Sequence, residues 1–262
     1  MSRRPWRRLG PPLALCLGLL VAWQAASVAL EIEEWLLPSP ARIVRAGWEA
    51  RSLLWPHIRE TTGETLIGFA VALATGLGLG MLIDYSSAVR AALYPLLVLS
   101  QTVPVIAIAP LLVIWFGYGI LPKIVVVALV CFFPIVVSTA DGLHGADPEQ
   151  IALLRTMGAT RRDIFFKVRW PGALPAVFTG IKVGITYSVI GAIMGEWVGA
   201  SRGLGVFMLR ATNSFRTDWV FVSIAITAAI SLGLFGLVTL IERTSLKWYY
   251  MSRRVEEWKE IR

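Results

Sequence analysis

Few side chains in this sequence are of types that could catalyse a reaction or bind a metal. The 262 residues include only two cysteines, Cys16 and Cys131, and two histidines. Each cysteine lies inside an apolar run, and no CxxC or Cys/His spacing occurs, so the pattern predicts neither a disulfide framework nor a metal site. The histidines have no nucleophile or second base placed to form a catalytic set. We therefore predict no catalytic residue, no metal and no bound cofactor, and we expect that the chain is not an enzyme.

Nucleotide and nucleic acid binding are not indicated either. None of the five lysines follows a glycine, so the sequence lacks the GxxxxGK[ST] loop that binds the phosphates of ATP. The net charge is +8, but the basic residues are scattered between apolar runs and form no continuous basic face. We expect no nucleic acid partner, and we expect that any ATP and Mg²⁺ that drive this protein are bound by another polypeptide.

The residues that could carry function lie instead in one polar segment, 147–171, which reads DPEQIALLRTMGATRRDIFFKVRWP. It separates two long apolar runs and contains five basic residues, of which Arg155, Arg161 and Arg162 cluster around a glycine. A rigid, charged projection of this kind is suited to transmitting force to a partner. The alternative is a charged loop that only sets the membrane topology.

The first half of this segment has the start and stop signals of a short helix. Asp147 is a good N-cap, Pro148 suits the first helical position, and Gln150 is placed to return a hydrogen bond to the cap. Gly158 supplies the left-handed position that commonly ends a helix. The apolar stripe of this helix is expected to consist of Ile151, Leu154 and Met157.

The second half repeats the pattern. Thr160 and Asp163 have the spacing of a second helix cap. We expect a second short helix to begin there and to end at Pro171, because proline cannot continue a helix of ordinary hydrogen bonding.

The composition predicts that this segment is positioned by membrane helices. The sequence is 56% hydrophobic and 16% charged, with a mean hydropathy of +0.67, far more apolar than a soluble domain. A span takes about 20 mostly apolar residues, so the length allows roughly six. Small residues at four-residue spacing favour close helix packing. The six predicted spans are 11–30, 61–83, 91–115, 121–140, 172–195 and 219–241.

The distribution of basic residues predicts the orientation. With the N-terminus inside, the cytoplasmic segments hold 16 Lys and Arg and the outside segments hold 8. The positive-inside rule then predicts both termini in the cytoplasm and the 147–171 segment on the same side. The outer residues 39–58 combine tryptophans, aliphatic residues and arginines, which is typical of a helix lying in the membrane interface.

Two groups of residues are candidates for a solute pathway. The span 91–115 contains Pro95, Pro104 and Pro110, each of which would kink or break it, and broken backbone at membrane depth indicates a cavity. A kinked packing helix is the alternative. Among charged residues, Lys182 either snorkels to the interface or faces a cavity, and Glu196 is expected to pair with Arg202 or Arg210 at an outer gate. The pathway candidates are Gln101, Pro104, Pro110, Lys182 and Glu196.

The 147–171 segment resembles the EAA loop of ABC importer permeases. That pattern is E-A-A, three residues, G, nine residues, a hydrophobic position, one residue and L-P. Gly158 stands at its glycine and Val168 at its hydrophobic position, but Ala152-Leu153-Leu154 replaces Glu-Ala-Ala and Trp170-Pro171 replaces Leu-Pro. The nitrate/sulfonate/taurine permease family is resembled by seven further blocks in order: LPSP, WPHI, PLLVIWFGYG, FFPIVVSTADGL, PGALPAVFTGIK, GEWVGASRGLG and FRTDWVF.

The resemblance implies an all-α polytopic membrane bundle of six transmembrane helices with the type I ABC importer permease fold. It also implies a bacterial inner membrane location, a second permease copy, a partner ABC ATPase and a periplasmic substrate-binding protein. The expected organisation is an N-terminal span with an interfacial segment (1–60), a permease core (61–245) with its coupling loop (141–171), and a cytoplasmic tail (246–262). The residues expected to couple to the ATPase are Leu154, Arg155, Met157, Gly158, Ala159, Thr160, Arg161 and Arg162.

The sequence leaves the solute open. Nitrate, taurine, sulfonates and bicarbonate are candidates, as are vitamin precursors of the pyrimidine or riboflavin type. A small organic anion is favoured because Lys182, Arg202 and Arg210 would supply a positive field near the pathway. The rival classes are an autonomous secondary transporter or channel and an intramembrane enzyme.

Overall fold

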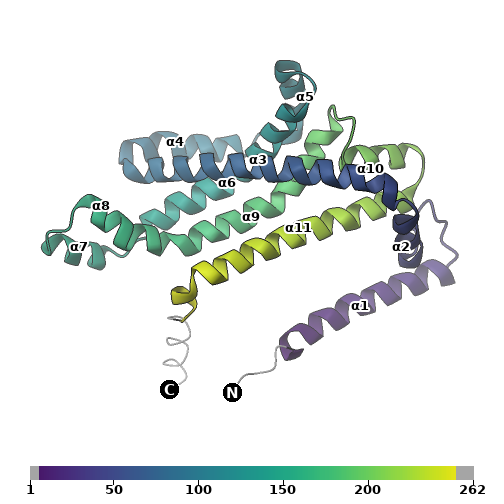
Figure 1. Ribbon diagram of the computed structural model, residues 1–262, viewed down its shortest axis with the longest axis horizontal. Helices are drawn as coiled ribbons and strands as arrows, with labels where there is room; N and C mark the ends of the chain where they lie inside the picture. Colours follow the sequence, from purple (N-terminus) through teal and green to yellow (C-terminus); the bar gives the residue numbers. More distant parts are fainter. Residues whose placement is uncertain (1–5, 252–262) are drawn as a thin grey trace.

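The computed structural model describes residues 6–251, with side chains from residue 10 onward, and this part of the chain is helical without a β-strand (Figure 1). The terminal basic residues and the end of the predicted tail lie outside the described residues. In chain order the helices are α1 (Trp6–Ala29), α2 (Pro40–Glu49), α3 (Arg51–Tyr85), α4 (Ser87–Ser100), α5 (Val105–Phe116), α6 (Ile120–His144), α7 (Pro148–Thr156), α8 (Arg161–Ile164), a π-helical turn (Phe165–Arg169), α9 (Trp170–Trp197), α10 (Leu204–Asn213) and α11 (Thr217–Ser245).

Five helical stretches are long and apolar enough to cross a membrane, as predicted. They are Gly10–Ala29, Arg51–Tyr85, Ile120–His144, Arg161–Trp197 and Thr217–Ser245. In Figure 1, the α7–α8 end of the bundle lies opposite the end that carries α10. The terminal sides of α1 and α11 are both directed toward α7 and α8, as an even number of crossings requires.

The predicted span 91–115 is a broken one. It consists of α4 and α5, which are bent by 97° at a break between residues 100 and 105. Pro104 lies at the break as the N-cap of α5, where its missing N–H costs nothing. Of the three prolines expected to kink or break the span, only Pro104 lies at the break, because Pro95 and Pro110 lie inside helices that continue past them. The chain tolerates one lost backbone hydrogen bond at each.

The core of the bundle consists of α3, α6 and α9, and α6 packs between the other two. Glycines allow these helices to pack closely, as the small-residue spacing predicted. A Cβ at Gly76 of α3 would lie 2.8 Å from the Ile135 side chain of α6, and a Cβ at Gly180 of α9 would lie 2.6 Å from the Pro134 carbonyl oxygen. The backbones therefore approach closely through positions where only glycine fits.

Helix α2 is amphipathic, but the predicted interfacial segment divides differently from the expectation. Ser39 caps α2 by accepting a hydrogen bond from the Arg42 N–H, and the helix breaks at Ala50. One face of α2 carries Ala46, which is buried against residues of α10 and α11. Residues 51–60 are not a separate surface helix, because they form the first turns of α3 and bury Leu54 in the same cluster.

Helix α1 is nearly detached from the rest of its own chain (Figure 1). Only 6% of the residues in its most apolar stretch are buried. Its contact with the bundle lies near its C-terminal end, where the Trp23 ring packs 5.5 Å from the Phe221 ring of α11. The apolar faces of α1 and α11 are therefore left for lipid or for another chain.

The expectation that Pro171 ends a helix was wrong. The chain is helical without interruption from Arg161 to Trp197. Within this stretch the backbone widens into a π-helical turn, in which the Trp170 N–H reaches the carbonyl oxygen of Phe165, five residues earlier. Pro171 follows directly, in the first turn of α9. Proline is tolerated there although it has no N–H to donate.

Candidate functional site

The segment between α6 and α9 folds as its capping residues dictate. The Asp147 side chain accepts a hydrogen bond from the Glu149 N–H (2.9 Å), whereas the expected return bond from Gln150 is not formed. Helix α7 ends at Thr156, and Gly158, two residues later, has a φ of +80°. The Gly158 N–H donates to the Arg155 carbonyl oxygen, a closing bond that occurs when glycine follows the last helical turn.

The second cap is a complete capping box. The Asp163 N–H donates to Thr160 Oγ1 (3.2 Å), and the Thr160 N–H donates to Asp163 Oδ2 (3.1 Å). Lys167 forms an ion pair with the same carboxylate at 2.9 Å. The starts of both short helices are therefore fixed by local contacts, as the sequence predicted.

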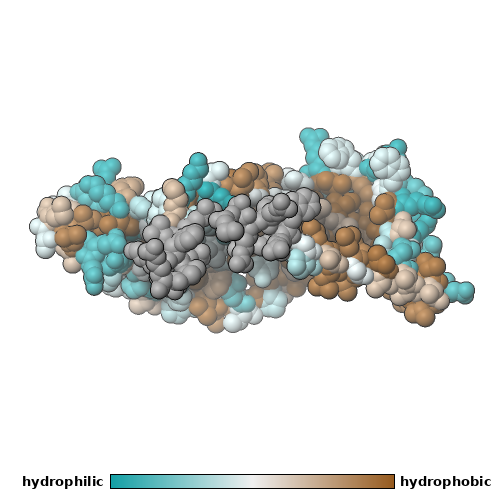
Figure 2. All heavy atoms as spheres, turned by 90° about the horizontal axis from the view of Figure 1, so that it is seen from below, coloured by the Kyte–Doolittle hydropathy of each residue, from teal (hydrophilic) through white to brown (hydrophobic). Residues whose placement is uncertain are grey.

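The exposed apolar side chains of this segment differ from the predicted stripe. Ile151 and Leu154 are half-buried, whereas Leu153 and Met157 are 62% and 73% exposed. Phe166, which the sequence reasoning did not single out, is also exposed. The i, i+4 spacing of Leu153 and Met157 is the signal that could have identified this face. Figure 2 shows the bundle surface from below, with hydrophobic and hydrophilic residues interspersed.

A pocket of about 610 Å³ separates this segment from the end of α3. Four arginines line it, and only Arg169 has an acidic partner, Asp84 of α3, at 2.9 Å. Arg162 lies over the Phe166 ring at 5.8 Å. Within residues 10–251, no carboxylate lies within ion-pair distance of the other three lining arginines, Arg155, Arg161 and Arg162.

The predicted pathway residues do not form one group. Gln101 and Pro104 lie together and exposed at the break between α4 and α5, and Pro110 lies further along α5. The inner face of α5 packs against the last turns of α9 through Met194 and Val198. Gln101 therefore places a polar side chain at the break between two largely apolar helices, and Pro104 begins the second of them.

Lys182 faces a cavity, the second of its two predicted alternatives, but its positive charge is not free. Its Nζ donates to both carboxylate oxygens of Glu242 on α11, at 3.1 and 2.9 Å. The Lys182 side chain is 22% exposed and the Glu242 side chain is 6% exposed. The sequence could not pair these residues, because they lie 60 positions apart and meet only when α11 packs on α9.

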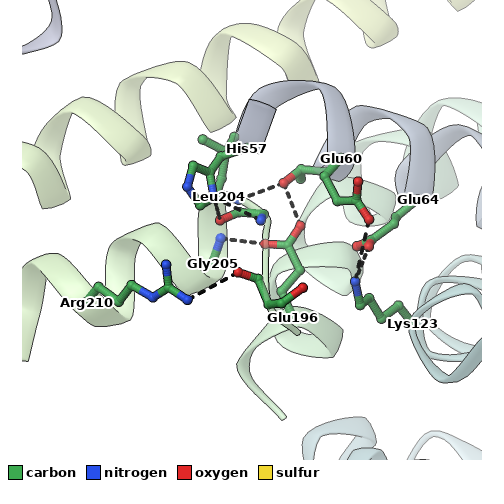
Figure 3. Close-up of polar contacts among 11 residues, drawn as sticks. His57, Glu60, Glu64, Lys123, Glu196, Leu204, Gly205 and Arg210 are labelled. Atoms are coloured by element: carbon green, nitrogen blue, oxygen red, sulfur yellow. Dashed lines mark hydrogen bonds and ion pairs between the residues drawn. The ribbon is translucent and has the colours of Figure 1, made fainter. Parts of the chain in front are cut away.

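The α10 end contains a buried polar cluster that the sequence reasoning largely missed (Figure 3). Lys123 of α6 contacts Glu64 of α3 and lies 4.0 Å from Glu60. Glu64 and Glu196 are each 1% exposed, and Lys123 is 7% exposed. The clue in the sequence was that Glu60 and Glu64 share a helix face at the start of a span.

The predicted ion pair of Glu196 with Arg202 or Arg210 was wrong. Glu196 accepts hydrogen bonds from Thr61 Oγ1 and from the Gly205 N–H, both at 2.5 Å. Glu196 therefore faces α3, and Arg210 donates to the Ser201 carbonyl oxygen instead of to Glu196.

The same cluster fixes the loop between α9 and α10. The Gly203 N–H lies 3.0 Å from His57 Nδ1, and the Leu204 N–H donates to Thr61 Oγ1 at 2.8 Å. Gly203 has a φ of +130°, and a Cβ at this position would overlap the Glu196 carboxylate. Side chains of α3 and α9 therefore hold this loop against the bundle.

A further ion network links α2 to the start of α11. Asp218 accepts from Arg42 Nη2 at 3.3 Å and from Arg216 at 3.1 Å. The hydrogen bond to Asp218 raises the pKa of the Arg216 guanidinium. The network stabilises the packing of α2 against the bundle.

Comparison with known proteins assigns the chain to a family. Residues 72–246 match the family described as binding-protein-dependent transport system inner membrane component, and the chain belongs to this family. It is an ABC importer permease, which is a non-enzymatic membrane subunit.

Its relatives carry several different solutes in their names. The chain is 38% identical to the formylaminopyrimidine transport permease protein ThiX of Halalkalibacterium halodurans, over 94% of this chain and 98% of that one. It is 38% identical to the riboflavin transport system permease protein RibX of Chloroflexus aurantiacus, over 95% and 93%. It is 30% identical to the taurine transport system permease protein TauC of Escherichia coli, over 95% of each. The resemblance to the nitrate/sulfonate/taurine family is confirmed. The relatives also include permeases named for formylaminopyrimidine and for riboflavin.

Solved structures confirm the predicted fold class. An amino acid ABC transporter aligns with a TM-score of 0.63 and 17% identity, over 76% of this chain and 97% of that one. The MetNI methionine ABC transporter aligns with a TM-score of 0.58 and 21% identity, over 72% and 98%. The fold is therefore the type I ABC importer permease fold.

Proposed function

We propose that this permease passes a small polar solute from a periplasmic binding protein to the cytoplasm, driven by a separate ABC ATPase. A homodimer of the chain would form the passage, with two copies of the ATPase and one binding protein. The α7–α8 end and both termini would then lie in the cytoplasm, as the excess of basic residues there favours.

One observation carries the coupling role. The segment from Asp147 to Arg169 has both of its helix starts capped by its own side chains, and it exposes Leu153, Met157 and arginines without an acidic partner in the described chain. A projection whose apolar side chains and arginines are exposed to solvent is suited to bind a partner surface with apolar and acidic groups. The detached α1 and the exposed face of α11 likewise favour a second copy in the membrane.

The relatives support two solute classes about equally. Formylaminopyrimidine and riboflavin appear in the names of two relatives, and aliphatic sulfonates, taurine and nitrate appear in others. We therefore propose a small polar solute that is either a vitamin precursor of the pyrimidine or riboflavin type or an organic anion.

Co-purification tests the coupling role. The tagged chain, expressed with the products of its neighbouring genes, should retain an ABC ATPase, and uptake into proteoliposomes should require ATP. Uptake that continues without ATP and follows an ion gradient would instead indicate a secondary transporter.

A paired substitution locates the coupling. Gly158→Asp places a side chain at a left-handed position, so it should reduce solute uptake at least about tenfold. It should leave membrane insertion unchanged. Gly172→Ala is the matched control, because a Cβ there meets no atom within 4 Å and its φ is ordinary. Equal uptake by the two variants would show that the segment does not couple.

A further inference from the structure

Helix α9 leaves a polar stripe uncovered at the depth of the membrane. Thr179, Thr186 and Tyr187 lie on this stripe and are exposed in the bundle. The Thr179 and Thr186 hydroxyls donate to the carbonyl oxygens of Pro175 and Lys182 in their own helix, so their oxygens remain available as acceptors. Beside the stripe lies a cavity of about 350 Å³, and a second cavity of about 590 Å³ continues toward the α7–α8 end.

The ion pair of Lys182 and Glu242 stands where these cavities adjoin. Lys182 and Thr179 line both cavities, and Glu242 lines the larger one. The larger cavity is also lined by Asp141, which pairs with Arg90 at 3.0 Å. Each charge along these two cavities is therefore compensated within the described part of the chain, and Lys182 does not supply the positive field expected of it.

The compensation has a consequence for a passing solute. An anion could reach Lys182 only by displacing Glu242, which would leave a carboxylate of 6% exposure without its partner. A solute that carries both a donor and an acceptor, and no net negative charge, can bind Glu242 and Lys182 without separating unlike charges. The exposed Tyr187 side chain and the acceptor oxygens of Thr179 and Thr186 supply further hydrogen-bonding partners of the kind that neutral polar solutes use.

We propose that the Lys182–Glu242 pair is a charge-compensated subsite that makes the passage selective for zwitterionic or neutral polar solutes over simple anions. The proposal rests on the transport function proposed above and narrows its solute class. It differs from the anion that the sequence favoured, because that expectation counted Lys182, together with Arg202 and Arg210, as a free positive charge near the pathway, and Lys182 is paired with Glu242.

Charged thiol reagents measure the field at this subsite directly, without knowledge of the solute. Thr186→Cys is introduced with Cys16→Ser and Cys131→Ser in the complex of permease and ATPase, in membrane vesicles. The labelling rates of the anionic sulfonatoethyl and the cationic trimethylammonioethyl methanethiosulfonates are then compared. In the otherwise unchanged protein, the ratio of the two rates should lie within about twofold of the ratio for a free thiol.

Neutralising either partner should shift this ratio in opposite directions. Glu242→Gln should favour the anionic reagent about tenfold, and Lys182→Met should favour the cationic reagent about tenfold. The exchanged pair, Lys182→Glu with Glu242→Lys, should restore the original ratio. Asp84→Asn is the matched control, since it removes an ion-paired carboxylate that lines neither cavity.

Three results would overturn the proposal. The first is a ratio that already favours the anionic reagent tenfold with both partners present, and the second is a ratio that Glu242→Gln leaves unchanged. The third is failure of both reagents to label Thr186→Cys, which would mean that the cavity is closed to water. None of these depends on ATP-driven uptake or on co-purification of the ATPase, so failure of the subsite and failure of the transport function are distinguishable.

Discussion

The two ends of the bundle treat their charges in opposite ways. At the α7–α8 end, three arginines that line the pocket remain exposed and without an acidic partner in the described chain. At the α10 end, three charged side chains are almost fully buried: Glu64, Lys123 and Glu196. Lys123 forms an ion pair with Glu64, and Glu196 accepts a hydrogen bond from the Gly205 N–H. One end keeps its interactions available to another molecule, and the other uses them to hold its own loop.

The difference also separates what is local from what is not. The α7–α8 segment takes its local shape from caps between neighbours in sequence, and only its last part is tied to other helices, through Ile164 and the pair of Arg169 with Asp84. The α10 end is built from contacts between α3, α6 and α9, so it can change only if those helices change their packing. A solute gate held in this way would respond to motion of the whole bundle.

The largest effect should follow from breaking the buried pair. Lys123→Met leaves Glu64 buried without its partner, and we expect a loss of about 3–5 kcal/mol in the free energy of unfolding. The measurement is denaturation of the purified complex in detergent, followed by tryptophan fluorescence. Lys167→Met is the control, because it removes an ion-paired lysine that is 67% exposed, and it should leave the unfolding transition where it is.

The double variant Lys123→Met with Glu64→Leu sharpens this prediction. Removing both partners should recover a large part of the lost stability, because no buried charge is then unpaired. If Lys123→Met unfolds no more easily than Lys167→Met, the α10 end is not held by its buried charges, and the contrast between the two ends fails.

A smaller effect is expected at the loop that this cluster holds. Gly203→Ala combines a φ of +130° with a Cβ that would overlap the Glu196 carboxylate, and we expect a loss of about 2–3 kcal/mol. Gly233→Ala, on α11 with no atom within 4 Å of the new Cβ, should be neutral or slightly stabilising. Denaturation of the complex measures both, and equal stabilities would mean that the loop adjusts without the cluster.

The contrast between the ends explains which parts of the molecule could be predicted. Gly158 and the Thr160–Asp163 box were predicted correctly because a cap depends on three or four adjacent residues. The pairs Lys123–Glu64 and Lys182–Glu242 were missed because each joins residues about 60 positions apart, and no local pattern encodes their helix register.

The spans show the same limit. Apolar runs predicted every crossing, since apolar length is the signal that the membrane imposes. They did not predict that α3 begins ten residues earlier than the expected span or that a π-helical turn carries the helix past Pro171. Both features depend on tertiary packing: α3 starts early because Leu54 is buried against α10 and α11.

The smallest change in stability, but a clear change in binding, is expected at the exposed end. Leu153 is 62% exposed, so Leu153→Ala should leave the unfolding of the permease unchanged. If this side chain contacts the ATPase, its truncation should weaken binding about tenfold, which is typical of a buried leucine at an interface. The measurement is titration of the purified ATPase onto the permease in nanodiscs. Leu209→Ala, an exposed leucine on α10, is the control and should bind normally. Leu154→Ala distinguishes the two faces of α7: a larger loss of binding there than at Leu153 would favour the stripe predicted from the sequence, and would mean that α7 turns its half-buried face toward the partner.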